Sequence, residues 1–328
     1  PFPTDRRPAI LKRRLLPPIR RRGRFRRTLA PNGHRQTASG CGTSEAAGGP
    51  TAGLGGAVIA DPPRVSTPDE KHAMRADPLL IIGVSARAAA KSAVRAGFWP
   101  LAIDRFQDQD LLRRCPAKPM PEDPGRLVEV AAAFPKCPWI YTGGLENLPA
   151  VVDALADHRP LYGNTGATLR QVRDPFLVAD TLRAAGLAAL EVQPCNTPLP
   201  PGKWLCKPLR SGGGLGITIA ESDPVLTPHT AYRQRYASGL TCSGVYVAAA
   251  GRSVWLGSTL QMSGAGWTGA GGFQYAGSLG PLALSPRYQA LFQRIGECLA
   301  ARFPLSGLFG VDCVLAQGQI WPLEVNPR

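Results

Sequence analysis

Two closing segments, residues 310–315 and 320–328, constrain the fold of this chain most strongly. Both predict β-strands, and residues 317–319 between them predict a three-residue hairpin loop with its glycine in the left-handed conformation. This register places Asp312 directly opposite Glu324. Because like charges that face each other destabilise a sheet, the hairpin predicts a cation between the two carboxylates.

The second strand adds further polar groups to the same place. Side chains alternate between the two faces of a strand, so Glu324, Asn326 and Arg328 share one face. Two carboxylates and an amide oxygen suit a hard cation such as magnesium. We therefore predict a metal site at Asp312, Glu324 and Asn326, with Arg328 facing the anion that the ion holds.

Composition and charge bound the remaining possibilities. The chain has 328 residues, 44% hydrophobic and 19% charged, which is enough for two or three structural units with buried cores. The net charge of +15 suggests a nucleic-acid partner. However, residues 1–76 alone carry 15 Lys/Arg and 5 Asp/Glu, a net +10. Most of the excess charge lies in this first quarter, so nucleic-acid binding by the folded part is disfavoured.

Residues 1–76 differ from the rest of the chain. A basic cluster precedes a stretch rich in Gly, Ala, Thr and Pro, and the lack of periodicity predicts disorder. Several interpretations stay open: an RNA-binding arm, a targeting peptide, a tail without a role, or a mis-assigned start with translation beginning at Met74.

The eight cysteines and the hydropathy pattern indicate a compartment. No two cysteines are closer than eleven residues, so no CxxC pair is present for zinc or redox chemistry. No apolar stretch approaches the roughly 20 residues of a membrane-spanning helix. These observations predict a cytoplasmic protein without a membrane span, and they leave its oligomeric state open.

Ordered structure is expected from residue 79 onwards. Ser85 is expected to cap a helix that ends at Gly97, between two apolar runs typical of buried parallel strands. Asp174-Pro175 is a typical helix start, and Gly186 a stop. The expected strands are 79–84, 101–104, 139–141, 204–207, 243–249 and 254–261. The expected helices are 86–96, 126–134, 175–185 and 285–302, the last with a core stripe of Tyr288, Leu291, Phe292, Ile295 and Leu299.

Two glycine-rich segments are candidates for binding. Lys207 stands on an apolar strand and precedes a Ser-Gly-rich loop at 211–216, which offers one charge and several free backbone N–H groups to a polyphosphate. Residues 264–269 match GxGxxG, but more glycines follow where a helix would have to start, so a dinucleotide site is disfavoured. We expect a mobile loop near the substrate there, or a plain surface loop.

Taken together, the motifs resemble the ATP-grasp superfamily over residues 79–328. The resemblance rests on Lys207 with its SGGGLGI loop, QRYASG at 234–239, and the two strands of the closing hairpin. The order of motifs also resembles a carboligase-like branch related to biotin carboxylase. It implies α/β and α+β structure: a Rossmann-like pre-ATP-grasp domain at 77–165, a lid subdomain at 166–236 and a C-terminal subdomain at 237–328.

The resemblance also implies roles for individual residues. Lys207 would contact the nucleotide phosphates and share catalysis with Arg328, while the metal ligands would hold magnesium, or manganese in its place. The implied nucleotide-binding residues are Lys207, Ser211, Gly212, Gly213, Gly214, Gly216, Gln234, Arg235, Tyr236 and Ala237.

The chain departs from the family pattern in two places. Relatives carry an early Lys or Arg just after an Asp, where this chain has a helix start, so Arg170 or Arg173 is expected to substitute. The family also continues where this chain stops, so we expect a further helix or more beyond Arg328.

The predicted function is an ATP-dependent ligase that activates a carboxylate as an acyl-phosphate for attack by an amine. Two alternatives remain open: a kinase-like phosphotransferase, and a degenerate nucleotide-binding module with a basic RNA-binding arm.

Overall fold

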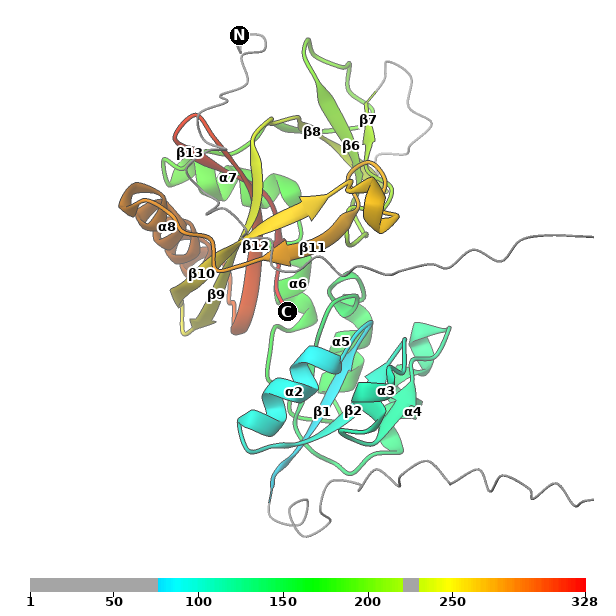
Figure 1. The fold of residues 1–328 in the computed structure, drawn as a ribbon. Helices are drawn as coiled ribbons and strands as arrows, with labels where there is room; N and C mark the ends of the chain where they lie inside the picture. The colour runs from blue at the N-terminus through cyan, green and yellow to red at the C-terminus, as the bar shows by residue number, and fades with distance from the viewer. Residues whose placement is uncertain (1–75, 221–229) are drawn as a thin grey trace, which may run out of the picture. The chain divides into compact units, whose positions relative to one another are not determined.

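A computed structural model describes residues 76–220 and 230–328. The basic, glycine-rich segment that the sequence predicts to be disordered lies outside the described residues. In the described part of the chain no helix is both long and apolar enough to span a membrane. The chain builds three sheets in succession (Figure 1).

The first sheet is parallel, with the strand order β3-β2-β1-β4. Its inner strands are continuous apolar runs because helices cover both faces. Helices α2 and α3 pack on one face, and α4 and α5 pack on the other. The strands are β1 (Pro78–Gly83), β2 (Trp99–Asp104), β3 (Ala117–Pro119) and β4 (Trp139–Tyr141), and the helices are α2 (Arg87–Arg95), α3 (Gln109–Leu112), α4 (Leu127–Ala132) and α5 (Pro149–Ala156).

The predicted cap of α2 is wrong. Ala86 holds the N-cap position without a side-chain cap, and Ser85 precedes it. The N–H of Ala86 instead donates to Asp104 Oδ2 at 2.6 Å. Asp104 ends the neighbouring strand β2 and is fully buried, so the carboxylate that satisfies this helix start comes from 18 residues away.

Helices α6 (Gly166–Val172) and α7 (Pro175–Ala184) lead to the second sheet. As predicted, Asp174 caps α7 by accepting from the N–H groups of Phe176 and Leu177. The second sheet is antiparallel, in the order β5-β8-β6-β7. Its strands are β5 (Val192–Pro194), β6 (Trp204–Pro208), β7 (Thr218–Ile219) and β8 (Ala231–Arg235).

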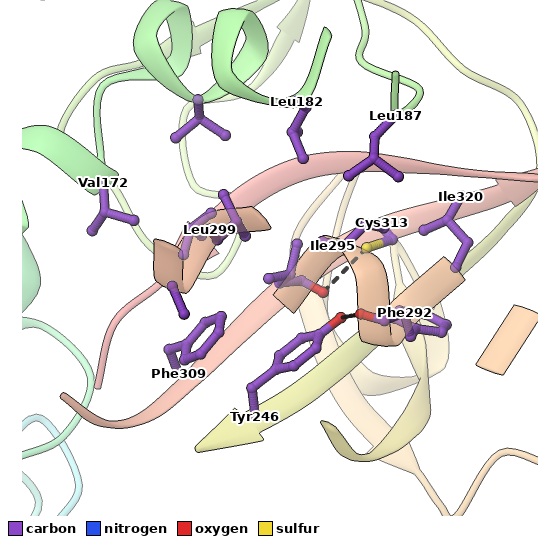
Figure 2. Packing of buried hydrophobic residues seen from close by; sticks show 14 of the residues in the cluster. Val172, Leu182, Leu187, Tyr246, Phe292, Ile295, Leu299, Phe309, Cys313 and Ile320 are labelled. Atoms are coloured by element: carbon purple, nitrogen blue, oxygen red, sulfur yellow. Dashed lines mark hydrogen bonds between the residues drawn. The ribbon is translucent and has the colours of Figure 1, made fainter. Parts of the chain in front are cut away.

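The third sheet is antiparallel, in the order β11-β10-β9-β12-β13. One face packs on helix α8 (Pro286–Arg302) through the predicted apolar stripe, with Phe292, Ile295 and Leu299 buried (Figure 2). Tyr246 lies among them and donates a hydrogen bond to the Phe292 carbonyl at 3.0 Å. The strands are β9 (Leu240–Ala249), β10 (Arg252–Ser263), β11 (Tyr275–Leu279), β12 (Gly307–Ala316) and β13 (Gln319–Asn326).

The closing hairpin has the predicted pairing but a different turn. Gln317 and Gly318 form a two-residue turn with φ of 51° and 73°, and Ala316 pairs with Gln319. A register shift between Asp312 and Cys313 then adds one residue to β13. The bulge restores the pairing of Asp312 with Glu324, which we had predicted from a three-residue loop.

Candidate active site

The paired carboxylates of Asp312 and Glu324 form the centre of the candidate site. Asn326 lies beside them on β13, and its Nδ2 donates to Asp312 Oδ2 at 3.0 Å and to Glu324 Oε1 at 3.5 Å. Gln261 on β10 also donates to Asp312 Oδ1 at 2.8 Å. All of these groups come from the third sheet, which therefore fixes their spacing.

The pKa values of the two carboxyl groups shift in opposite directions, because the surrounding cations act chiefly on Glu324. Burial, and then the charge of Glu324, raise the pKa of Asp312 to about 6. Burial also acts against the ionised form of Glu324, but Lys207, Arg173 and Arg328 outweigh it and lower the pKa of that carboxyl. The surrounding cations therefore favour the ionised form of Glu324, whereas hydrogen bonds from Ser243 and Gln261, together with Arg328, oppose the rise in the Asp312 pKa.

The donor set fits a magnesium ion that is shared with a phosphate ligand. Within the described residues, no group of three or more His, Cys, Asp or Glu side chains could hold a metal ion by itself. Magnesium commonly takes one or two protein carboxylates and completes its shell with water and phosphate oxygens. Asn326 turns its amide nitrogen toward the carboxylates, so its oxygen could join the ligands only after the amide turns over.

Lys207 on β6 connects the second sheet to this centre. The residue is 5% exposed, and its Nζ donates to Gln234 Oε1 at 3.1 Å and to the Leu323 carbonyl at 3.4 Å. Leu323 lies at the bulge of β13, and Gln234 Nε2 donates to the same carbonyl at 3.2 Å. Burial acts against the lysine charge, but Tyr232 and Glu324 outweigh it, so the pKa of Lys207 is raised.

Residues 234–237, which the resemblance implies as a hinge against the adenine, divide into two groups. Gln234 is buried beside Lys207. Arg235 donates to the Pro201 carbonyl at 3.2 Å, and its guanidinium lies 5.5 Å from the Trp204 ring centroid. Tyr236 lies against Lys203, whose Nζ is 4.2 Å from its ring centroid. Of these four residues, the structure therefore brings Gln234 to Lys207. The side chains of Arg235 and Tyr236 instead contact residues of the 201–204 segment. Ala237 is partly buried.

The glycine loop at 211–216 contacts other parts of the chain at two points. The Ser211 carbonyl accepts from Asn147 Nδ2 at 3.3 Å and from Arg173 Nη2 at 3.1 Å. The Gly213 carbonyl accepts from the Tyr275 N–H at 2.9 Å. A side chain on Gly214 would collide with the Phe273 carbonyl, whereas one on Gly212 would meet open space; Gly216, like Gly213 and Gly214, has a positive φ. The glycine-rich segment around 264–274 thus packs on this loop.

Arg173 is one of the two arginines that the sequence offered as a substitute for the family's early Lys or Arg. Its side chain is 12% exposed, with Nη1 3.8 Å from Glu324 Oε2 and 3.3 Å from Asn326 Oδ1. Arg170 instead pairs with Asp153 at 3.0 Å, and both of those side chains are more than 40% exposed. The structure therefore brings Arg173, and not Arg170, to the carboxylate pair.

Glu146 and Asn147 are contacts that sequence reasoning missed. They lie in η3 (Leu145–Asn147), just after parallel strand β4. Glu146 is buried and accepts from Arg328 Nη1 at 2.7 Å, while Asn147 Oδ1 accepts from Arg173 Nη2 at 3.0 Å. The available signal was topological, because the order β3-β2-β1-β4 changes direction between β1 and β4. Residues that follow the carboxyl ends of strands at such a switch point are candidates for a binding site.

Comparison with known proteins agrees with this geometry. Residues 173–328 match a family model described as an ATP-grasp domain. No curated protein sequence matches the chain.

Solved structures share the fold. The biotin carboxylase domain of Hydrogenobacter thermophilus 2-oxoglutarate carboxylase, in complex with MgADP, ADP and bicarbonate, is 13% identical with a TM-score of 0.59, over 77% of this chain and 64% of that one. N5-carboxyaminoimidazole ribonucleotide synthetase from Thermus thermophilus is 14% identical with a TM-score of 0.59, over 76% and 71% of the two chains. A putative ATP-grasp superfamily protein from Archaeoglobus fulgidus is 18% identical with a TM-score of 0.55, over 77% and 81%. The predicted mixed α/β class with an ATP-grasp fold is therefore confirmed, while the Rossmann-like pre-ATP-grasp domain stays a prediction.

Proposed function

We propose that the chain is an ATP- and magnesium-dependent ligase, because residues 173–328 match an ATP-grasp domain model and the chain shares its fold with a biotin carboxylase domain. It activates a carboxylate as an acyl-phosphate, which an amine or a similar nucleophile then attacks. The observation that carries this proposal is the half-buried pair Asp312–Glu324, surrounded by Lys207, Arg173 and Arg328. A carboxylate pair with three cations around it suits the binding of a metal together with a polyphosphate.

Each side chain has a distinct role in this proposal. Asp312 and Glu324 would hold magnesium, joined by Asn326 once its amide turns over, and the bound ion would neutralise charge that develops on the transferred phosphoryl group. Lys207 and Arg173 contact the phosphates from two sides, and both are held in place by hydrogen bonds to fixed oxygens. Arg328 presents a planar guanidinium to the carboxylate or to the acyl-phosphate.

The glycine loop and the hinge complete the proposed nucleotide site. Backbone N–H groups at 211–216 fold over the phosphates, and residues 234–237 line the adenine. The predicted roles of Gly212, Gly213, Gly214 and Gly216 are part of this proposal. Magnesium is the ion proposed, since the Hydrogenobacter domain was solved with MgADP.

The substrates are proposed as small molecules. The Hydrogenobacter complex contains bicarbonate and the Thermus enzyme is named for a carboxyamino product, so a small carboxylate and a nitrogen nucleophile are the classes proposed here. The seven cysteines in the described part of the chain are all free, which supports a reducing compartment such as the cytoplasm.

ADP release tests the proposal directly. The wild-type chain with ATP and magnesium should release ADP only when a suitable carboxylate is present, and Glu324→Ala should abolish release while circular dichroism stays unchanged. Undiminished turnover in Glu324→Ala would contradict the metal assignment. A stable phosphate ester formed without any amine would indicate a phosphotransferase instead of a ligase.

A further inference from the structure

Glu146 is a buried carboxylate that the proposed chemistry does not yet use. It is 4% exposed and lies in η3, at the carboxyl end of the first sheet. Its Oε1 accepts from Arg328 Nη1 at 2.7 Å, and its Oε2 accepts from the Gly144 N–H at 2.6 Å. A residue that follows the first sheet therefore holds the arginine after the closing strand, 182 positions away in sequence.

The same arginine nitrogen also contacts the metal site. Arg328 Nη1 donates to Asn326 Oδ1 at 2.8 Å, so one nitrogen is shared between Glu146 and the amide of a proposed metal ligand. Among the described residues no acceptor engages Nη2 or Nε of Arg328. The guanidinium is thus fixed at one corner, and its other donors remain available to a ligand.

We infer that Glu146 is a positioning residue that orients the Arg328 guanidinium for the acyl-phosphate step. This inference rests on the proposed function of Arg328. An arginine side chain loses rotamer freedom when it is fixed, and here Glu146 fixes it before any substrate binds. Pre-orientation of this kind lowers the barrier of the chemical step and leaves nucleotide affinity unchanged.

The exposure of the two partners argues against a purely structural ion pair. The Glu146 side chain is 3% exposed and that of Arg328 is 36% exposed. A buried charge is stabilised only by well-placed partners, whereas a partly exposed arginine keeps its water and gains little stability from the pair. Glu146, the buried partner, therefore holds the partly exposed guanidinium of Arg328 in place.

The neighbouring residue supports the same inference. Asn147 accepts from Arg173 and donates to the Ser211 carbonyl of the glycine loop. Two consecutive side chains of η3 thus contact the two arginines that flank the carboxylate pair. The loop after β4 therefore acts on the geometry of the site and not only on the packing of the first sheet.

The test uses Glu146→Gln in the full chain, because glutamine keeps the size and one oxygen for the Gly144 N–H but loses the charge. We expect kcat for ADP release to fall about tenfold or more, while KM for ATP stays within about twofold; tenfold corresponds to about 1.4 kcal/mol. Glu129→Gln, which removes an exposed carboxylate from α4 beside the same sheet, is the matched control and leaves kcat unchanged.

A double variant separates positioning from structure. If Glu146 acts through Arg328, then Arg328→Ala and the double variant with Glu146→Gln have the same kcat, because the arginine to be oriented is already absent. Additive losses would overturn the inference. Should Glu146→Gln fail to fold, Glu146→Asp keeps the charge and is expected to restore most of the kcat lost in Glu146→Ala.

A measurement independent of turnover distinguishes this inference from the proposed function. In ¹⁵N NMR spectra of arginine side chains, the Arg328 signals, assigned through Arg328→Lys, should show slow guanidinium rotation in the wild type and fast rotation in Glu146→Gln. Equal rotation in both proteins overturns the inference, whether or not the enzyme turns over. No ADP release by the wild type, with rotation still dependent on Glu146, would refute the proposed function alone.

Discussion

The carboxylate pair should destabilise the protein when no cation is bound. The pKa of Asp312 is raised from 3.8 to about 6, which corresponds to about 3 kcal/mol of differential interaction between its two protonation states. Because the folded-state pKa lies above the unfolded value, the stability linked to this group is fully present below about pH 4 and is lost as the pH rises through 6. Asp312→Asn removes the titration altogether.

We therefore expect the free energies of unfolding of the wild type and Asp312→Asn to be equal near pH 4. Above pH 7 the variant should be more stable by about 3 kcal/mol, because the asparagine is never ionised beside Glu324. Urea denaturation at pH 4 and pH 7.5, in buffers with chelator, measures the difference. A wild type as stable as the variant at pH 7.5 would refute the reasoning.

Adding a divalent cation supplies the control for the same experiment. Magnesium or manganese should stabilise the wild type at pH 7.5 and have little effect on Asp312→Asn, since ligand binding raises the free energy of unfolding only where the site is intact. Equal stabilisation of both proteins would mean that the cation binds elsewhere.

The glycine loop and Arg173 give two more predictions. Gly214→Ala places a side chain against the Phe273 carbonyl at a φ of 74°, so the loop should open and trypsin cleavage after Arg210 should speed up severalfold. Gly212→Ala, at an open position, should leave the cleavage rate unchanged. Arg173→Met should raise KM for ATP tenfold or more, whereas Arg170→Met should not change it; a reversed order would assign the phosphate contact to Arg170.

Much of the fold could be predicted because its signals are local. The inner strands of the first sheet are continuous apolar runs, and the stripe on α8 repeats with the helical period, so the sequence carries both patterns directly. Asp174-Pro175 is likewise a local signal, and the structure has this cap as predicted. Ser85 shows the limit, because the carboxylate that satisfies the start of α2 belongs to Asp104 on another strand.

The site was harder to predict because its parts come from three sheets. Asp312 and Glu324 belong to one hairpin, so the expected register of its two strands was enough to pair them. The sequence left two candidates, Arg170 and Arg173, for the arginine that faces the carboxylate pair. One helical turn separates them, and only the packing shows that Arg173 is the one that faces the pair. Glu146 carries no local signal for its contact with Arg328, which depends on how two distant segments meet.

The bulge at Leu323 has a consequence for how this hairpin tolerates insertions. A turn lengthened by one residue could absorb the extra residue of β13 and still leave Asp312 opposite Glu324, so the pairing of the proposed metal ligands tolerates this change in turn length. The position of the Leu323 carbonyl would change, because a hairpin without the bulge would turn this carbonyl away from Lys207 and Gln234. One inserted residue could therefore separate the two halves of the proposed site, because the carboxylate pair would stay in register while Lys207 would lose its contact with the Leu323 carbonyl.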